Sequence, residues 1–168
     1  MRNIAIVGLL GCMLALSAGA NALAASDQDK SFLHDALQDN VDLRTLSDYA
    51  AQKVRDSKVR QFAQMVSQRA NTLDGTLTVT ARRNDIRPPD SLSLRASDQY
   101  SRIQAQSPRD AVDEYLRDVA IDARISEDDY TSEAQSGTEP KLKRLASDRA
   151  AELERIARTA DALRGSVR

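Results

Sequence analysis

The chain has 168 residues, of which 24 are Lys or Arg and 25 are Asp or Glu, so its formal net charge is −1. A surface this evenly charged argues against nucleic acid as a partner, because nucleic-acid-binding proteins need a basic face. One cysteine and one histidine exclude most disulfide, thiol and zinc chemistry, and the scarcity of aromatic residues predicts a core of Leu, Val, Ile and Ala.

The first 24 residues have the layout of a secretory signal peptide. Arg2 precedes an uncharged apolar run over residues 4–18, and Ala22-Leu23-Ala24 forms an A-x-A cleavage pattern. The apolar run is shorter than the roughly 20 residues that a membrane span needs. We therefore predict a signal peptide over residues 1–24, a folded domain over residues 25–168, and a periplasmic or cell-envelope location.

Cys12 offers an alternative route to the envelope. It follows Leu9-Leu10-Gly11, which looks like a bacterial lipobox, and lipidation there would keep the following residues as a membrane tether. The apolar segment before Cys12 is very short for a signal peptide, which favours cleavage after Ala24. The domain that remains after that cut contains no cysteine.

Two long helices are predicted at the start of the domain. Apolar residues recur at spacings of three, four and seven over residues 27–54, and again from Ser57 to about residue 80. Either Asp56 or Ser57 can cap the start of the second helix. Alternation over Thr76–Thr80 also fits a strand, but no second strand exists to pair with it, so we predict a helix.

A loop and a short helix come next. Residues 84–90 contain two adjacent prolines that cannot continue a helix, and residues 91 to about 106 are predicted to form a short one. Ser107 and Pro108 then suit the cap and first turn of another long helix, where the charge of Asp110 is also favourable.

A second break over residues 136–140 leads into the last helix. Gly137 is expected in the left-handed conformation that often ends a helix, and Thr138 is expected to cap the helix that follows. That helix, residues 142–163, has the most regular apolar stripe in the chain, interrupted only by Arg149. The fold class predicted is all-α, an up-and-down four-helix bundle with one extra short helix and an N-terminal signal helix.

A search for chemistry within this bundle finds no site. A carboxylate-bridged di-iron centre needs two Glu-x-x-His motifs, and the chain has none. His34, interpreted as a solvent-facing or boundary residue with a pH-sensitive group as the alternative, is the only imidazole available as a base. No Gly-x-Ser-x-Gly turn is present. The acidic run Glu127-Asp128-Asp129 is interpreted as a solvated face, because neighbouring side chains on a helix point apart. We predict no catalytic, cofactor-binding or metal-binding residues, and no enzyme.

A few polar residues lie on or beside the stripes. Asp42, Asp122 and Asp128 are the acids considered for an all-carboxylate metal site, and their faces are predicted not to converge. Arg69 and Asp122 each lie beside a buried stripe, and a contact between them across the bundle is one hypothesis, since an unpaired buried charge is costly. The alternative is that both lie at the stripe edges and reach solvent.

Over about residues 28–163 the chain resembles the DUF4142 family of exported bacterial proteins. The resemblance lies in Ser31-Phe32-Leu33 with Ala36 and Asn40, Leu46, Ala50, Ser57-Lys58-Val59-Arg60-Gln61-Phe62-Ala63, Met65-Val66, Tyr115, Glu133-Ala134-Gln135-Ser136-Gly137, Leu142-Lys143, Leu145-Ala146 and Ala160-Asp161-Ala162-Leu163. It implies a ferritin-like helical bundle of unestablished biochemical function. Family members usually carry a glutamate and histidines suggestive of a metal site, and the resemblance places those positions at Leu43, Arg69, Ala123 and Ile156, none of which can act as such a ligand.

Two functional hypotheses follow. The first is a non-catalytic envelope or stress-associated protein that acts through an unknown protein partner or through self-association. The second is a ferritin-like metal-binding or redox protein with an atypical carboxylate site. Neither cofactor nor small-molecule substrate is identified.

Overall fold

The computed structural model describes residues 25–166, all of whose regular structure is helical. The five helices are α1 (Asp27–Lys53), α2 (Ser57–Arg83), α3 (Leu94–Ala105), α4 (Pro108–Ser136) and α5 (Pro140–Ser166). The all-α prediction is confirmed, with four long helices and one short one. The predicted signal peptide, its helix and Cys12 lie outside the described residues.

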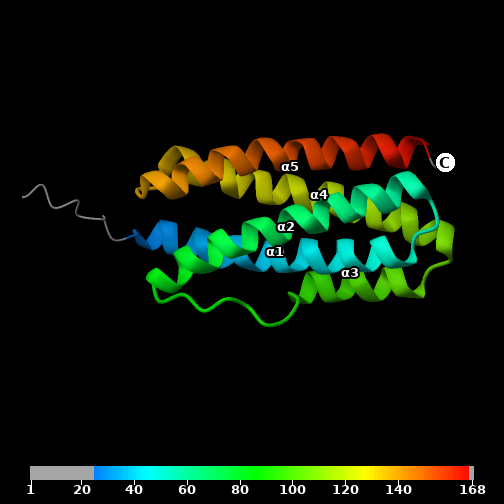
Figure 1. Ribbon diagram of the computed structural model, residues 1–168, viewed down its shortest axis with the longest axis horizontal. Helices are drawn as coiled ribbons and strands as arrows, with labels where there is room; N and C mark the ends of the chain where they lie inside the picture. The colour runs from blue at the N-terminus through cyan, green and yellow to red at the C-terminus, as the bar shows by residue number, and fades with distance from the viewer. Residues whose placement is uncertain (1–24, 167–168) are drawn as a thin grey trace, which may run out of the picture.

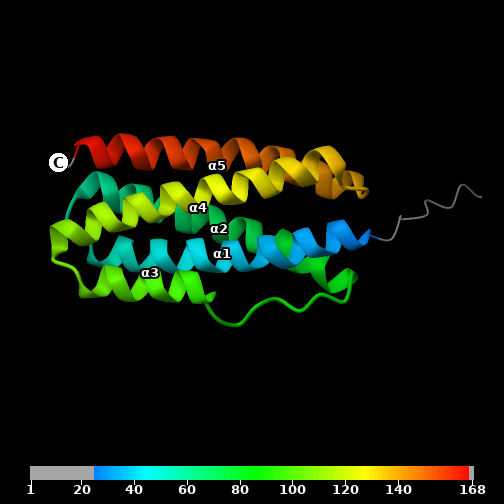
Figure 2. The same ribbon diagram turned by 180° about the vertical axis from the view of Figure 1, so that it is seen from behind.

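The four long helices form two hairpins that pack through one pair of helices. α1 packs along α2 and α4 packs along α5, and the hairpins meet mainly where α1 contacts α4. α2 and α5 contact each other much less, and they diverge toward the end that carries the α4–α5 turn (Figure 1). The short helix α3 lies outside the four, beside α1 and α4 (Figure 2).

The helix starts follow the capping chemistry expected from the sequence. The Asp56 side chain accepts hydrogen bonds from the N–H groups of Lys58 and Val59, and Ser107 caps α4 with Pro108 in its first turn. Ser26 and Asp29 form a capping box at the start of α1. Residues 76–80 lie within α2, so the helical interpretation of their alternating pattern is confirmed.

The core is aliphatic, as the composition requires. Each fully buried leucine stabilises the fold by roughly 1.5–3 kcal/mol. Buried leucines of the core include Leu33, Leu37, Leu46, Leu77, Leu116 and Leu153. Two aromatic residues link the hairpins: Tyr130 packs edge-on against Phe32, and the buried Tyr115 donates a hydrogen bond to Ser47 Oγ at 3.0 Å.

The α4–α5 turn differs from the prediction at two residues. Gly137 has φ −59° and is not left-handed. Glycine is needed there for space, since a Cβ at this position would lie 2.6 Å from Glu133 Cδ. Thr138 does not cap α5 either: the Glu139 carboxylate accepts from the N–H groups of Lys141 and Leu142, while Thr138 bonds to α1.

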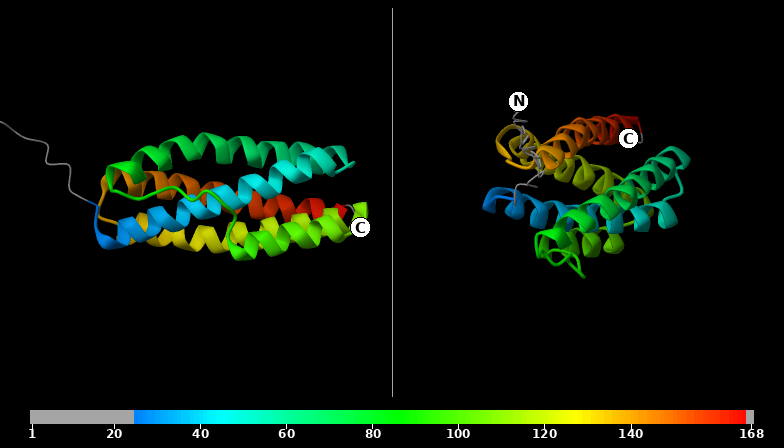
Figure 3. Two further views of the ribbon diagram at one scale, coloured as in Figure 1. Left: turned by 90° about the horizontal axis from the view of Figure 1, so that it is seen from below. Right: turned by 60° about the vertical axis from the view of Figure 1, so that its left-hand side comes forward.

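None of the five described helices has an apolar stretch long enough to traverse a lipid bilayer. Seen from below (Figure 3, left), α2 and α3 lie at opposite edges of the helix bundle. These two sides carry the polar cavity and the groove described next.

Candidate functional site

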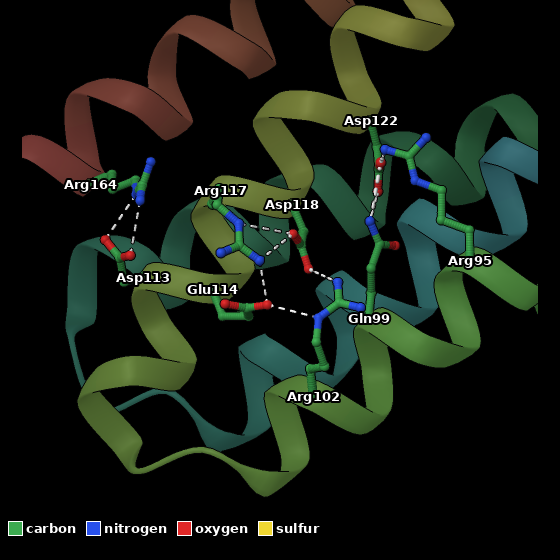
Figure 4. Close-up of polar contacts among 9 residues, drawn as sticks. All are labelled: Arg95, Gln99, Arg102, Asp113, Glu114, Arg117, Asp118, Asp122 and Arg164. Carbon is green, nitrogen blue, oxygen red and sulfur yellow. Dashed lines mark hydrogen bonds and ion pairs between the residues drawn. The ribbon is translucent and has the colours of Figure 1, made fainter.

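A network of ion pairs fixes α3 against α4. Arg102 of α3 contacts Glu114 at 2.9 Å and Asp118 at 3.3 Å, and Arg117 bridges the same two carboxylates from α4 (Figure 4). Asp118 is buried, so its charge needs these partners. The network sets the register of α3, and with it the position of every side chain that α3 directs toward α1.

Arg95 and Gln99 lie within two turns of Arg102 along α3, and both contact Asp122 of α4. Gln99 donates from Nε2 to both carboxylate oxygens, at 2.9 and 3.2 Å, and Arg95 forms an ion pair with one of them (Figure 4). Gln99 is only 4% exposed, whereas the arginine head lies toward solvent. The carboxylate therefore fixes the orientation of the glutamine amide.

The first helix completes a small cavity of about 100 Å³ with these residues. Asp42 anchors the start of α3, because it accepts hydrogen bonds from the N–H and hydroxyl of Ser93 at 3.0 and 2.6 Å. One turn earlier, Asp39 accepts from the Ser126 hydroxyl at 2.6 Å. Asp39, Asp42 and Asp122 thus line one cavity from α1 and α4, with α3 as its third wall.

Two of these acids, Asp39 and Asp122, have pKa values above the ordinary value of an aspartate. Burial raises the pKa of Asp39 to about 6, against the opposing effect of its bond from Ser126, and the charges of Asp129, Asp42 and Asp122 raise it further. Burial also raises the pKa of Asp122, even though Gln99 and Arg95 favour its charged form. Asp39 and Asp122 therefore place carboxylate groups where few water molecules can solvate their charge.

Asp29 and Glu133 form a second group of buried acids, at the end of the bundle opposite the α1–α2 turn. Asp29, which is fully buried, accepts hydrogen bonds from the Thr138 N–H at 2.8 Å, the Thr138 hydroxyl at 2.5 Å and the Ser26 N–H at 2.7 Å. Burial opposes its ionisation, but these bonds outweigh burial and hold its pKa well below the usual range. Asp29 thereby ties the start of α1 to the α4–α5 turn.

Glu133 lies beside Asp29 and is also buried. Burial raises the pKa of Glu133 to about 8, and the neighbouring Asp29 adds to the shift. Neither of its oxygens accepts a hydrogen bond from a donor within residues 25–166. The raised pKa of Glu133 favours its protonated form at neutral pH beside the Asp29 carboxylate.

On another side of the bundle, α2 and α5 border an open groove, which we name the α2/α5 groove. It consists of two adjoining hollows of about 660 and 390 Å³ that share Thr76, Lys141 and Leu145. Leu73 and Leu145 are half-buried in it, and Val79 is 51% exposed. Apolar surface is thus left open between two helices.

The structure corrects the prediction for the candidate acids. Asp42 and Asp122 do converge on the α1/α3/α4 cavity, whereas Asp128 is exposed on another part of α4. The error arose because α3 folds back and closes a space between α1 and α4 that single helix faces do not reveal. Within the described residues, no group of three His, Cys, Asp or Glu side chains is arranged to hold a metal ion.

The hypothesis of an Arg69–Asp122 contact is wrong. Arg69 is exposed and pairs with Glu152 of α5 at 2.5 Å, while Asp122 pairs with α3. α2 and α4 lie diagonally across the bundle, so their edge residues face different neighbours. The alternative interpretation of Arg69, as an edge residue, is confirmed.

The other predicted residues lie where helix geometry places them. His34 is solvent-facing, as interpreted, and its ring contacts the adjacent Asp35 at 3.1 Å. Of the positions implied by the family resemblance, Leu43, Ala123 and Ile156 are buried in the core. Leu43 and Ala123 also form apolar walls of the α1/α3/α4 cavity.

The polar residues that sequence reasoning missed include the buried Asp29, Gln99 and Glu133 and the half-buried Asp39. A signal existed for two of them, since Gln99 stands three and four residues from the buried Ala96 and Ile103, and Asp29 stands three before Phe32. These spacings place a polar residue on an apolar stripe. For Asp39 no such signal exists, because it lies beside the stripe and becomes enclosed only through α3.

Comparison with known proteins identifies the family but no activity. The family described as "Domain of unknown function (DUF4142)" matches residues 14–163. None of the curated proteins matches the chain. A crystal structure of a DUF305 fragment from Deinococcus radiodurans is similar in fold, with a TM-score of 0.76 and 15% sequence identity over 84% of this chain and 98% of that one. At this identity the likeness supports the fold alone.

Proposed function

The chain belongs to the DUF4142 family of domains of unknown function, and from that premise we propose a non-catalytic, exported bacterial protein that holds an acidic amphipathic helix of a partner protein in its α2/α5 groove. The observation that carries the proposal is the open seam between α2 and α5. A hydrophobic groove between helices is a common receptor for the apolar face of a third helix.

The dimensions of the groove suit such a partner. Its two hollows together run beside residues 73–83 of α2 and 139–152 of α5, with Leu73 and Leu145 between them. Three turns of a helix span about 16 Å, which is the length of the α2 segment that borders the groove. Docking would remove Val79 and both leucines from water.

The rim of the groove gives the expected charge of the partner. Arg83, Lys141 and Arg144 line it and form no ion pair within the described residues, and only Asp148 opposes them unpaired. The other two acids of the rim, Glu152 and Glu139, already have partners. Glu152 is paired with Arg69 and Arg149, and Glu139 caps α5. The rim is therefore cationic on a chain whose net charge is −1, which favours an acidic partner.

Export to the periplasm or cell envelope is part of the proposal. Cleavage after Ala24 would leave the capping box of Ser26 and Asp29 intact, so the mature chain would begin at the first helix. Mass spectrometry of the mature N-terminus tests this. A lipid-modified Cys12 would instead establish the tethered form, and an unprocessed cytoplasmic chain would contradict export.

Site-specific photo-crosslinking in living bacteria tests the groove. A photoreactive residue replaces Val79 in the groove, and a matched one replaces the exposed Thr159 on α5, which does not line it. We expect capture only from position 79, of a segment with an apolar stripe flanked by acids. Lys141→Glu with Arg144→Glu should abolish that capture.

Other products would contradict the proposal. Capture of lipid, of a basic segment or of a second copy of this chain would replace the acidic helix with that occupant. Equal capture from positions 79 and 159 would show that the groove selects nothing. Arg60→Glu, a charge reversal on α2 away from the groove, serves as the matched control for the rim and should leave capture unchanged.

A further inference from the structure

One buried carboxylate ties the start of α1 to the α4–α5 turn. Asp29 accepts hydrogen bonds from the N–H and hydroxyl of Thr138 at 2.8 and 2.5 Å, and from the N–H of Ser26 at 2.7 Å. These donors favour its charged form although it is fully buried. We name this contact, together with Glu133 and Gly137 beside it, the Asp29 junction.

The Glu133 carboxyl in this junction has neither a donor nor solvent around it. Glu133 is 1% exposed, and neither of its oxygens accepts a hydrogen bond from a group within residues 25–166. A carboxylate ion in such surroundings is strongly unfavourable unless donors or a cation compensate its charge. The closed junction therefore accommodates the neutral carboxyl of Glu133 much better than the ion.

The charged groups that face Glu133 do not compensate a negative charge. Asp29 of α1 and Glu139 of the α4–α5 turn oppose its ionisation, and Lys143 of α5 alone favours it. The Lys143 ammonium group already donates to the carbonyl oxygen of Gln135 at 3.0 Å, on the surface. Burial, reinforced by Asp29, consequently raises the pKa of Glu133 to about 8.

The α4–α5 turn covers the Glu133 carboxyl. A Cβ at Gly137 would lie 2.6 Å from Glu133 Cδ, so the backbone of the turn passes directly over the carboxyl. A hollow of about 160 Å³ between α1 and α4 ends at Glu133 and is also lined by Phe32, Asp35 and Asp129, but the oxygens of Glu133 stay buried. Water can therefore solvate them only if the turn or the start of α1 moves.

The start of α1 has little else to hold it. Among residues 26–31, Asp29 is the only buried one. The following turn is held by the buried Phe32 and Leu33, and Phe32 packs edge-on against Tyr130 with ring centroids 4.9 Å apart. Because few apolar contacts fix the first turn, it can open while the rest of α1 stays packed.

We propose that the Asp29 junction is a pH-dependent conformational device, in which ionisation of Glu133 releases residues 26–31 of α1 from the α4–α5 turn while the bundle stays folded. The closed junction retains the proton of Glu133 and the open one releases it. Opening is therefore increasingly favoured as the pH rises from the ordinary value of 4.5 to about 8, where the closed form also ionises. The inference does not depend on the function proposed for the α2/α5 groove.

Amide hydrogen exchange of the purified protein, followed by NMR at pH 5.5 and 7.5 and corrected for the intrinsic exchange rates, tests the proposal. The reporter is the Thr138 N–H, which the Asp29 carboxylate accepts from at 2.8 Å. The matched amide is that of Val59, which donates to Asp56 at 3.0 Å at the other end of the bundle. We expect protection of Thr138 to fall by about tenfold or more, because opening releases a proton, and protection of Val59 to stay constant.

Variants identify the titrating group. Glu133→Gln cannot ionise and should give Thr138 the same protection at both pH values, and Glu133→Met serves as a second such variant if the first fails to fold. Glu127→Gln, the same substitution at a half-buried position of α4, should behave as the wild-type protein. Constant protection of Thr138 in the wild-type protein, a parallel loss at Val59, or a pH dependence that persists in Glu133→Gln would each overturn the proposal.

Discussion

Glu133 and Asp39 are both acids withdrawn from water, and they differ in what compensates their burial. Glu133 has a pKa of about 8 and remains protonated at neutral pH beside Asp29, whereas Asp39 has a pKa of about 6 and is mostly ionised. Glu133 loses its charge by binding a proton. Asp39 keeps its charge at the edge of a partly open cavity. The comparison shows that enclosure can neutralise one acid of a bundle and leave another charged.

The largest effect is expected at the acidic pair. Asp29→Ala removes the capping box and the bonds that tie α1 to Thr138. We expect a loss of about 3 kcal/mol in the free energy of unfolding, measured by urea denaturation. A loss below about 1 kcal/mol would show that the Asp29 junction contributes little.

The pH dependence of stability gives the next effect. The native pKa of Glu133 lies above its ordinary value of 4.5, so the native state binds the extra proton. Its stabilising contribution is complete at low pH, declines as the pH rises from about 4.5 and is lost above about pH 8. Glu133→Gln should remove this slope, because the amide does not titrate. Identical slopes in denaturation curves of the two proteins would contradict the raised pKa of Glu133.

Asp39→Asn should act in the opposite direction at neutral pH. Above its native pKa of about 6, Asp39 carries a charge that is poorly solvated in the folded protein. The neutral amide should therefore stabilise the protein by about 1 kcal/mol at pH 7. The gain should vanish below about pH 4, where the acid is protonated in both states. Thermal unfolding at pH 7 and pH 3.5 measures both values, and destabilisation at pH 7 would count against an uncompensated charge.

The smallest effect is expected for the control acid. Asp35 is exposed, and within residues 25–166 its carboxylate pairs with His34 alone, so Asp35→Asn should change the free energy of unfolding by less than about 0.5 kcal/mol. A change as large as that of Asp39→Asn, measured under the same conditions, would mean that general charge repulsion along α1, not enclosure by α3, sets the difference.

The helices themselves were predictable from the sequence, and the enclosed polar residues were not. The apolar stripes and the caps at Asp56 and Ser107 depend on contacts within a few residues, which sequence spacing reports directly. The prediction of a left-handed conformation for Gly137 was wrong. Glycine is required there because a Cβ would collide with Glu133.

The candidate site depends on a longer-range event. Asp39 and Asp122 meet only because α3 folds back along α4 and is held there by Arg102. The register of α3 is set by these ion pairs and by Asp42 at its start, none of which follows from periodicity. The sequence therefore predicted the walls of the cavity as separate helices but not the cavity.

The most direct test of the account is a carbon-detected NMR titration of the carboxyl groups in protein labelled at Asp and Glu. We predict that Asp39 titrates near pH 6 and Glu133 near pH 8. Titration of both groups near pH 4 would contradict the account.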